Sequence, residues 1–143
     1  MNAFKSERDM VQYLTQCLKE RGHEPTVEVP FLGRSIDLVY KTSDGKVNAV
    51  ELKLQPRHMQ RALEQAKICL LGADRVYICL PAFDVGEKMI LQLRSKGIGL
   101  ILLNGNKGKA PINYKVGASK SNPIKRAEYS RLLKSRLADR GNG

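Results

Sequence analysis

The segment from Val47 to Leu54 constrains the fold of this chain more than any other. Its sequence, Val-Asn-Ala-Val-Glu-Leu-Lys-Leu, has the branched and apolar composition of a β-strand that packs into a core. Side chains alternate between the two faces of a strand, so Glu51 and Lys53 lie on the same face. A buried strand avoids a carboxylate and an ammonium group unless they are paired or bind something. The segment therefore predicts a core strand that carries a functional site.

The residues before this strand predict a helix and two further strands. Apolar residues recur at helical spacing over residues 6–21, with Ser6 as a suitable N-cap. Residues 26–31 and 35–41 both alternate in polarity, and Pro30 is typical of an edge strand or a strand end. Asp44-Gly45 favours a hairpin turn. We expect a helix followed by an antiparallel meander of three strands.

The residues after this strand predict two helix–strand units. Helical stripes cover residues 57–71 and 84–97, and each is followed by an apolar strand, over residues 75–80 and 98–103. A helix that joins two strands in this way indicates a parallel crossover. The predicted fold class is α/β, more strictly an α+β mixed sheet flanked by helices, with the order α-β-β-β-α-β-α-β.

The charge of the chain is unevenly distributed. The 143 residues carry a formal net charge of +11, and residues 105–143 hold ten Lys and Arg against two acids. We expect a core domain over residues 1–104, then a basic linker with a short strand near residues 114–116. A basic amphipathic helix is expected from about residue 122 to residue 139. Such a tail favours an acidic partner, namely nucleic acid or an anionic surface.

Three cysteines, Cys17, Cys69 and Cys79, lie in apolar contexts without the spacing of a zinc site. Their odd number fits a reducing compartment. The N-terminus lacks the apolar segment of a signal peptide, and no apolar run approaches the ~18 residues of a membrane span. We therefore expect a cytoplasmic protein with no membrane partner.

Carboxylates on separate elements can converge on the face that carries Glu51. Asp37 lies on the preceding strand, one hairpin away, and Glu7 lies on the apolar stripe of the first helix. Carboxylates packed together repel one another, and a hard divalent cation such as Mg²⁺ resolves the conflict. A metal beside Lys53 in a basic protein suits phosphodiester hydrolysis.

The spacing of Asp37, then 13 residues, then Glu51-Leu52-Lys53 resembles the PD-(D/E)xK nuclease superfamily over about residues 6–103. That superfamily includes restriction enzymes, Holliday junction resolvases and repair nucleases. The resemblance implies a restriction-endonuclease-like core in which Asp37, Glu51 and the backbone carbonyl of Leu52 bind metal and Lys53 is catalytic. It also implies that Glu7 is a further metal ligand and that the helix after the motif supplies a polar catalytic residue, for which Gln65 is the best match and Arg61 a weaker one. Ile36 stands where the family name has Pro.

A second acid-x-Lys triplet, Asp44-Gly45-Lys46, falls in the predicted turn and is set aside because its side chains would be solvated. The expected activity is a Mg²⁺-dependent endonuclease, with Mn²⁺ able to substitute, that cuts DNA in a structure-directed or weakly sequence-specific way. RNA is not excluded, and a homodimer would suit cutting of both strands. Candidate phosphate-binding residues are Arg34, Arg57, Arg61, Lys125, Arg126, Arg131 and Lys134.

Two other interpretations stay open at the level of sequence. The chain could be a nucleic-acid-binding module that keeps the fold without catalysis, which predicts binding without metal dependence. It could also be an interaction subunit whose basic C-terminal helix docks on an acidic partner. The retained set of carboxylates argues against the binding module, because a chain freed from catalysis need not keep them.

Overall fold

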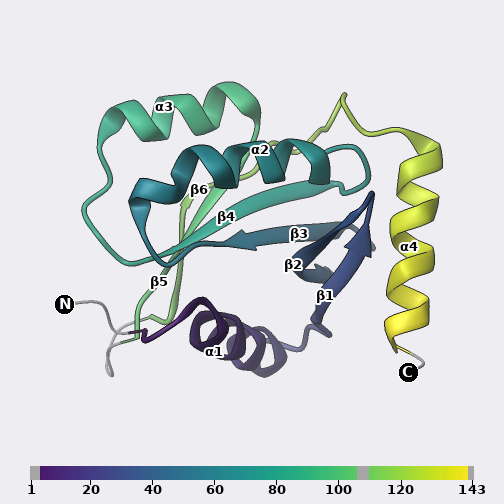
Figure 1. Ribbon diagram of the computed structural model, residues 1–143, viewed down its shortest axis with the longest axis horizontal. Helices are drawn as coiled ribbons and strands as arrows, with labels where there is room; N and C mark the ends of the chain where they lie inside the picture. Colours follow the sequence, from purple (N-terminus) through teal and green to yellow (C-terminus); the bar gives the residue numbers. More distant parts are fainter. Residues whose placement is uncertain (1–3, 106–109, 142–143) are drawn as a thin grey trace.

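The computed structural model describes residues 4–105 and 110–141 and has a mixed sheet between layers of helices (Figure 1). In this part of the chain the sheet has six strands in the order β1-β2-β3-β4-β5-β6, which is also their order in sequence. The strands are β1 (Thr26–Phe31), β2 (Arg34–Lys41), β3 (Val47–Leu52), β4 (Arg75–Pro81), β5 (Gly99–Leu103) and β6 (Ile112–Val116). The helices are α1 (Glu7–Glu20), α2 (Met59–Cys69), α3 (Glu87–Lys96) and α4 (Ala127–Gly141), and a 3₁₀ turn (Pro56–His58) precedes α2.

The pairing of the strands confirms the predicted α+β fold. The first three strands are antiparallel, β3, β4 and β5 are parallel, and β6 returns antiparallel to β5. The crossovers through α2 and α3 are those that the two helix–strand units predicted. This topology is that of a restriction-endonuclease-like core, to which β6 and α4 are added.

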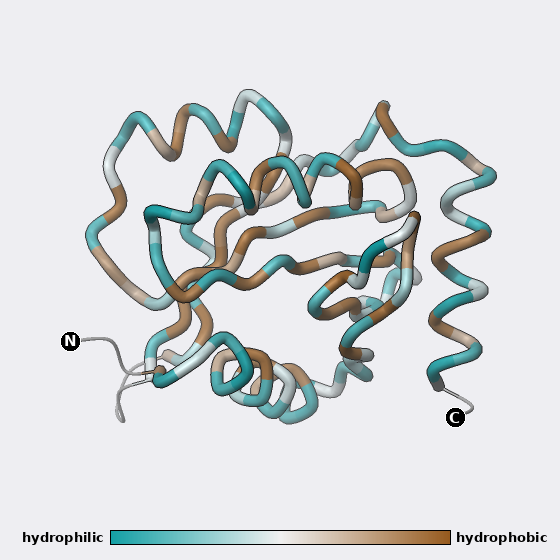
Figure 2. The backbone as a smooth tube through the Cα atoms, viewed as in Figure 1, coloured by the Kyte–Doolittle hydropathy of each residue, from teal (hydrophilic) through white to brown (hydrophobic). Residues whose placement is uncertain are grey.

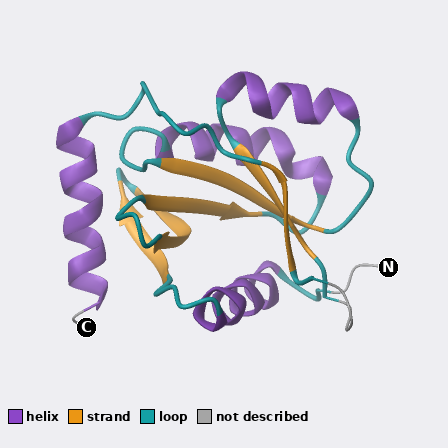
Figure 3. Cartoon of the chain, turned by 180° about the vertical axis from the view of Figure 1, so that it is seen from behind, coloured by secondary structure: helices purple, strands orange, loops and turns teal. Residues whose placement is uncertain are grey.

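Helices cover both faces of the sheet (Figure 3). Buried residues of α1, such as Leu14, pack with Val50 of β3 on one face. Buried residues of α2 and α3, such as Leu63 and Leu93, pack with Ala49 of β3 on the other. Figure 2 shows the apolar stretches concentrated along the central strands. All six residues of β3 are buried, so the predicted central strand is confirmed, although it ends at Leu52 rather than Leu54.

The basic C-terminal part is packed onto this core. Strand β6 completes the sheet, and α4 lies beside the edge strand β1 (Figure 1). Leu133 of α4 is fully buried in the same apolar cluster as the residues of α2. At the far end of α4, Arg140 donates a hydrogen bond to the carbonyl of Val27 in β1 (3.1 Å). The helix therefore covers an edge strand that would otherwise present unpaired backbone groups.

The helix begins later than its sequence predicts. The expected start at residue 122 is wrong, because α4 begins at Ala127. The side chain of Asn122 donates to the carbonyls of Leu70 and Ala73, both at 2.8 Å. These bonds anchor the connecting segment to the loop after α2. No helix in the described residues is long and apolar enough to cross a membrane.

Candidate active site

Strands β2 and β3 part at the end that carries the predicted site. Their backbone pairing runs from Lys41 with Val47 to Leu38 with Val50, and the next position in this register would pair Asp37 with Glu51. At that position the carboxylate of Asp37 accepts a hydrogen bond from the backbone N–H of Leu52 (2.8 Å). The N–H of Leu52 thus donates to a side-chain oxygen of β2 instead of a backbone carbonyl. This bond fixes Asp37 against the end of β3.

Glu51 is buried beside Asp37 and is held by two groups. Its Oε1 accepts a hydrogen bond from Arg34 Nη1 at 2.8 Å and contacts Cys69 Sγ of α2 at 3.5 Å. Burial, followed by the charge of Glu51, raises the pKa of the Cys69 thiol well above its ordinary value, so the thiol keeps its proton and donates. The second carboxylate oxygen, Oε2, is buried and has no hydrogen-bond partner among the residues that the structure describes. When Asp37 is ionised, one half of the Glu51 carboxylate therefore has no donor among the described residues.

The environment of Asp37 disfavours its negative charge. Burial and the negative charge of Glu51 together raise the pKa of Asp37 to about 6. The hydrogen bond from Leu52 and the positive charge of Lys53 act in the opposite direction with less effect. The structure therefore brings Glu51 and Lys53 within electrostatic reach of Asp37, and their roles in a site stay a prediction.

Two unpartnered oxygens, one on Glu51 and one on α2, are of the kind that a hard divalent cation binds. Glu51 Oε2 and Gln65 Oε1 are both buried oxygens without hydrogen-bond partners, and buried polar atoms are normally satisfied. Gln65 lies one helical turn before Cys69, on the same face of α2. Carboxylate and amide oxygens are the ligands that Mg²⁺ and Mn²⁺ prefer. The expected ligand role of the Leu52 carbonyl stays a prediction.

Glu7 is not brought into this cluster. It lies exposed in the first turn of α1, after the N-cap Ser6, whose side chain accepts from the N–H of Asp9 (3.1 Å). Within residues 4–105 and 110–141, no three His, Cys, Asp or Glu side chains are arranged to hold a metal. Two carboxylates, Asp37 and Glu51, form the centre of the site, and the role of Glu7 stays a prediction.

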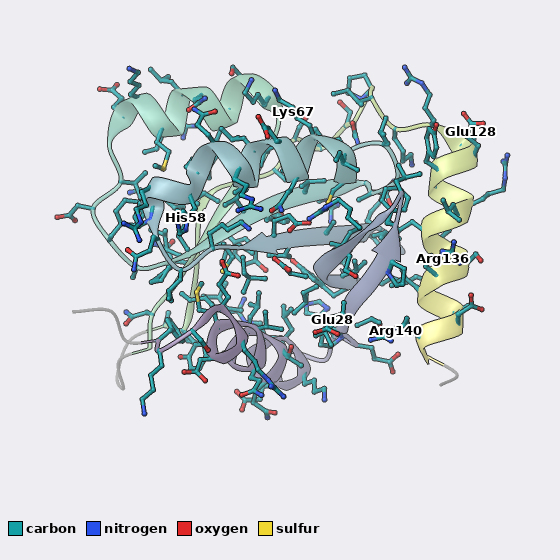
Figure 4. All side chains as sticks on the ribbon, in the orientation of Figure 1. Glu28, His58, Lys67, Glu128, Arg136 and Arg140 are labelled. Atoms are coloured by element: carbon teal, nitrogen blue, oxygen red, sulfur yellow. The ribbon has the colours of Figure 1, made fainter. Side chains whose placement is uncertain are left out.

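An irregularity opposite Asp37 was not predicted from sequence. The pairing of β1 with β2 omits the position at which Glu28 faces Asp37, and Glu28 has a left-handed backbone (φ +51°). Leu38 packs in the layer of α1 whereas Ile36, two residues earlier, packs in the layer of α2. A left-handed conformation costs a non-glycine residue about 1–2 kcal/mol. The strain accompanies the change of face in β2 where it carries Asp37 (Glu28 is labelled in Figure 4).

The predicted phosphate-binding residues fall into different surroundings. Arg34 is paired with Glu51, and Lys125 forms an ion pair with Asp74 at 2.6 Å. Arg126 donates to the carbonyls of its own turn, at 2.9–3.2 Å for the two nearest. The side chains of four others are exposed to solvent: Arg57, Arg61, Arg131 and Lys134.

Comparisons with known proteins show similarity of fold. No family model and no curated protein sequence matches the chain. Solved structures with a similar fold include SPO1766, a protein of unknown function from Silicibacter pomeroyi, with a TM-score of 0.66 and 12% identity over 97% of this chain and 88% of that chain. They also include a repair endonuclease from Pyrococcus abyssi, with a TM-score of 0.50 and 21% identity over 72% of this chain. The match spans about half of the endonuclease, 49% of its chain.

Proposed function

We propose that this protein is a metal-dependent endonuclease that hydrolyses phosphodiester bonds in DNA. The observation that carries the proposal is the pairing of half-buried Asp37 with buried Glu51 where β2 and β3 part, with the charge of Lys53 acting on the Asp37 carboxyl. A net charge of +11 suits a polyanionic substrate. The similarity of fold to a repair endonuclease supports nucleic acid as the substrate class.

Each residue of the site has a role in this proposal. Asp37 and Glu51, with the Leu52 carbonyl, would hold Mg²⁺ or Mn²⁺, and Gln65 would add an oxygen donor. The bound metal would polarise the phosphate and lower the pKa of an attacking water. Lys53 would neutralise the charge that develops on the phosphoryl oxygens. Glu7, in the first turn of α1, is a further metal ligand only if nucleic acid or metal draws it inward.

Binding in this proposal depends mainly on the DNA backbone. Lys and Arg contacts to phosphates supply affinity that is independent of sequence and falls with salt. This suits a nuclease that cuts according to the structure of its substrate. RNA would use the same chemistry, and a second protomer would place two sites on one duplex.

One observation favours a binding module without catalysis instead. In the structure Arg34 already neutralises Glu51, so the carboxylate has a partner without any metal. Such a module would bind DNA in a salt-sensitive manner that EDTA does not change. The unpartnered Oε2 of the same carboxylate favours the enzyme.

Cleavage assays decide between the metal-dependent endonuclease and the binding module. Plasmid, linear and branched DNA are incubated with Mg²⁺, Mn²⁺ or EDTA, and the wild type is compared with Glu51→Gln and Lys53→Ala. The matched control is Lys46→Ala, which removes the lysine of the second acid-x-Lys triplet in the β2–β3 turn. We expect metal-dependent cutting in the wild type and control, and loss of cutting with retained DNA binding in the two site variants. Cutting that survives both site substitutions, or no cutting of any substrate, contradicts the proposal.

A further inference from the structure

The turn between β1 and β2 forms one wall of an open pocket next to the candidate active site. The pocket has a volume of about 310 Å³ and lies between residues 30–35 and Arg136 of α4. Leu32 and Gly33 both have left-handed backbones (φ +51° and +79°), which closes the two-residue hairpin and places Arg34 at the first position of β2. Figure 4 labels Arg136 on α4, beside these strands.

The charged residues that line this pocket are both basic, beside the apolar side chains of the turn. The lining includes Arg34, Arg136 and Ser35, and among the described residues no acidic side chain lines it. Guanidinium groups bind phosphate oxygens through paired N–H donors, and a serine hydroxyl can add a further donor. The pocket is open to solvent and large enough for a phosphodiester group. Its chemistry therefore selects an oxyanion.

Arg34 connects this pocket to the carboxylate pair. Its Nη1 donates to Glu51 Oε1 at 2.8 Å, while 19% of its side chain remains exposed. A guanidinium has five N–H donors, so the one group can face a carboxylate on one side and a phosphate on the other. When a divalent cation binds Glu51, the charge of Arg34 is no longer needed there and repels the cation. A phosphate in the pocket offers Arg34 an alternative partner.

We propose that the pocket between the β1–β2 turn and Arg136 binds a backbone phosphate of DNA, and that this phosphate draws Arg34 away from Glu51. This inference rests on the proposed function, because it assigns a substrate subsite to the same active site. It makes Arg34 a competitor of the metal in the free protein and a ligand of the substrate in the complex. DNA and metal then favour each other's binding, and the coupling is reciprocal.

The pocket is tested first through Arg136, which makes no contact with Glu51 among those that the structure shows. Binding of a short DNA duplex is measured in EDTA across a series of salt concentrations. The slope of log K against log[salt] is negative, and loss of one phosphate contact reduces its magnitude by about 0.9. We expect this change for Arg136→Gln and not for Arg94→Gln, a matched charge loss on the exposed surface of α3. If the two variants have equal slopes, the proposal that this pocket binds a DNA phosphate is overturned.

The coupling is tested by Mn²⁺ binding, followed by electron paramagnetic resonance in a Lys53→Ala background, with and without the duplex. DNA is expected to raise the Mn²⁺ affinity by at least about fivefold, within the usual range of couplings. Arg136→Gln should reduce this effect without changing the DNA-free affinity. Arg34→Gln should bind Mn²⁺ more tightly than its parent in the absence of DNA, with folding checked by circular dichroism. If Arg34→Gln does not fold, the effect of DNA on the Mn²⁺ affinity of Arg136→Gln alone decides whether the coupling exists.

The outcomes separate this inference from the proposed function. Unchanged or weaker DNA-free Mn²⁺ binding in folded Arg34→Gln, or undiminished coupling in Arg136→Gln, overturns the shared role of Arg34 while metal-dependent cutting by the wild type still stands. No Mn²⁺ binding with or without DNA overturns both the coupling and the metal-dependent nuclease. In that case the salt slope of Arg136→Gln still decides whether the pocket binds phosphate.

Discussion

Replacement of Asp37 by Asn is expected to stabilise the metal-free protein at neutral pH. Burial and the charge of Glu51 raise the pKa of Asp37 from 3.8 to about 6. In the unfolded chain this carboxyl loses its proton near pH 4, whereas the folded protein retains the proton until about pH 6. The stability of the wild type therefore falls as the pH rises between these values, and the loss is complete above them.

The magnitude follows from the size of the shift. One pKa unit corresponds to about 1.4 kcal/mol, so a shift of about two units costs the wild type about 3 kcal/mol at neutral pH. The Asn side chain keeps an oxygen that can accept from the N–H of Leu52, but a neutral acceptor is weaker by about 1 kcal/mol. The net gain for Asp37→Asn is therefore about 1–3 kcal/mol above pH 6.

Urea unfolding in EDTA at about pH 4 and pH 8 measures this effect. The matched control is Asp44→Asn, for which we expect the opposite sign. Hydrogen bonds from the Thr42 hydroxyl, Arg75 and the Lys46 N–H hold the pKa of Asp44 well below its ordinary value. Asp44 thus contributes stability at neutral pH that is lost as the pH falls. The reasoning is refuted if Asp37→Asn is no more stable than the wild type at pH 8, or if its gain is the same at both pH values.

Three further predictions follow from the site and the core. Millimolar Mn²⁺ should raise the melting temperature of the wild type but not of Glu51→Gln. A ligand that binds only the folded state stabilises the protein by about 2.7 kcal/mol at 100 times its Kd. An equal rise in both proteins would mean that the metal binds elsewhere. Leu133→Ala should cost about 2–5 kcal/mol in urea unfolding, because Leu133 is fully buried, whereas the exposed Leu91→Ala should change stability by less than about 0.5 kcal/mol. Gly72→Ala should lower the melting temperature, because its Cβ would lie 2.7 Å from the ring of Phe31; an unchanged value would mean that the ring moves aside.

The sequence predicted the elements that depend on local patterns. Alternation and apolar runs located all the strands of the core, and the placement of Asp37 and Glu51 on strands joined by one hairpin followed from them. The ion pair of Arg34 could not be predicted, because Arg34 follows a turn, where a side chain can face either solvent or the sheet. Glu28 gave no signal of its left-handed backbone, since Glu is not a residue typical of that conformation.

The surface on which α4 packs also could not be predicted from the sequence. Its apolar stripe predicted a helix with one buried side, and Leu133 and Leu137 do pack against the core. The stripe did not identify the surface that it covers, because that surface is formed by β1, about a hundred residues earlier in the chain. The helix was expected from about residue 122, but the side chain of Asn122 instead anchors the connecting segment to the loop after α2.

The order of the strands has a consequence for how the chain is made. Each strand pairs with the strand that precedes it in sequence, so the sheet can grow one strand at a time as the polypeptide leaves the ribosome. The first strand, however, waits for the last helix before its open edge is covered. During that interval the edge can pair with other chains. Newly synthesised protein is therefore exposed to aggregation until α4 has been made and has docked on β1. Faster synthesis and docking of the C-terminal residues shortens this interval.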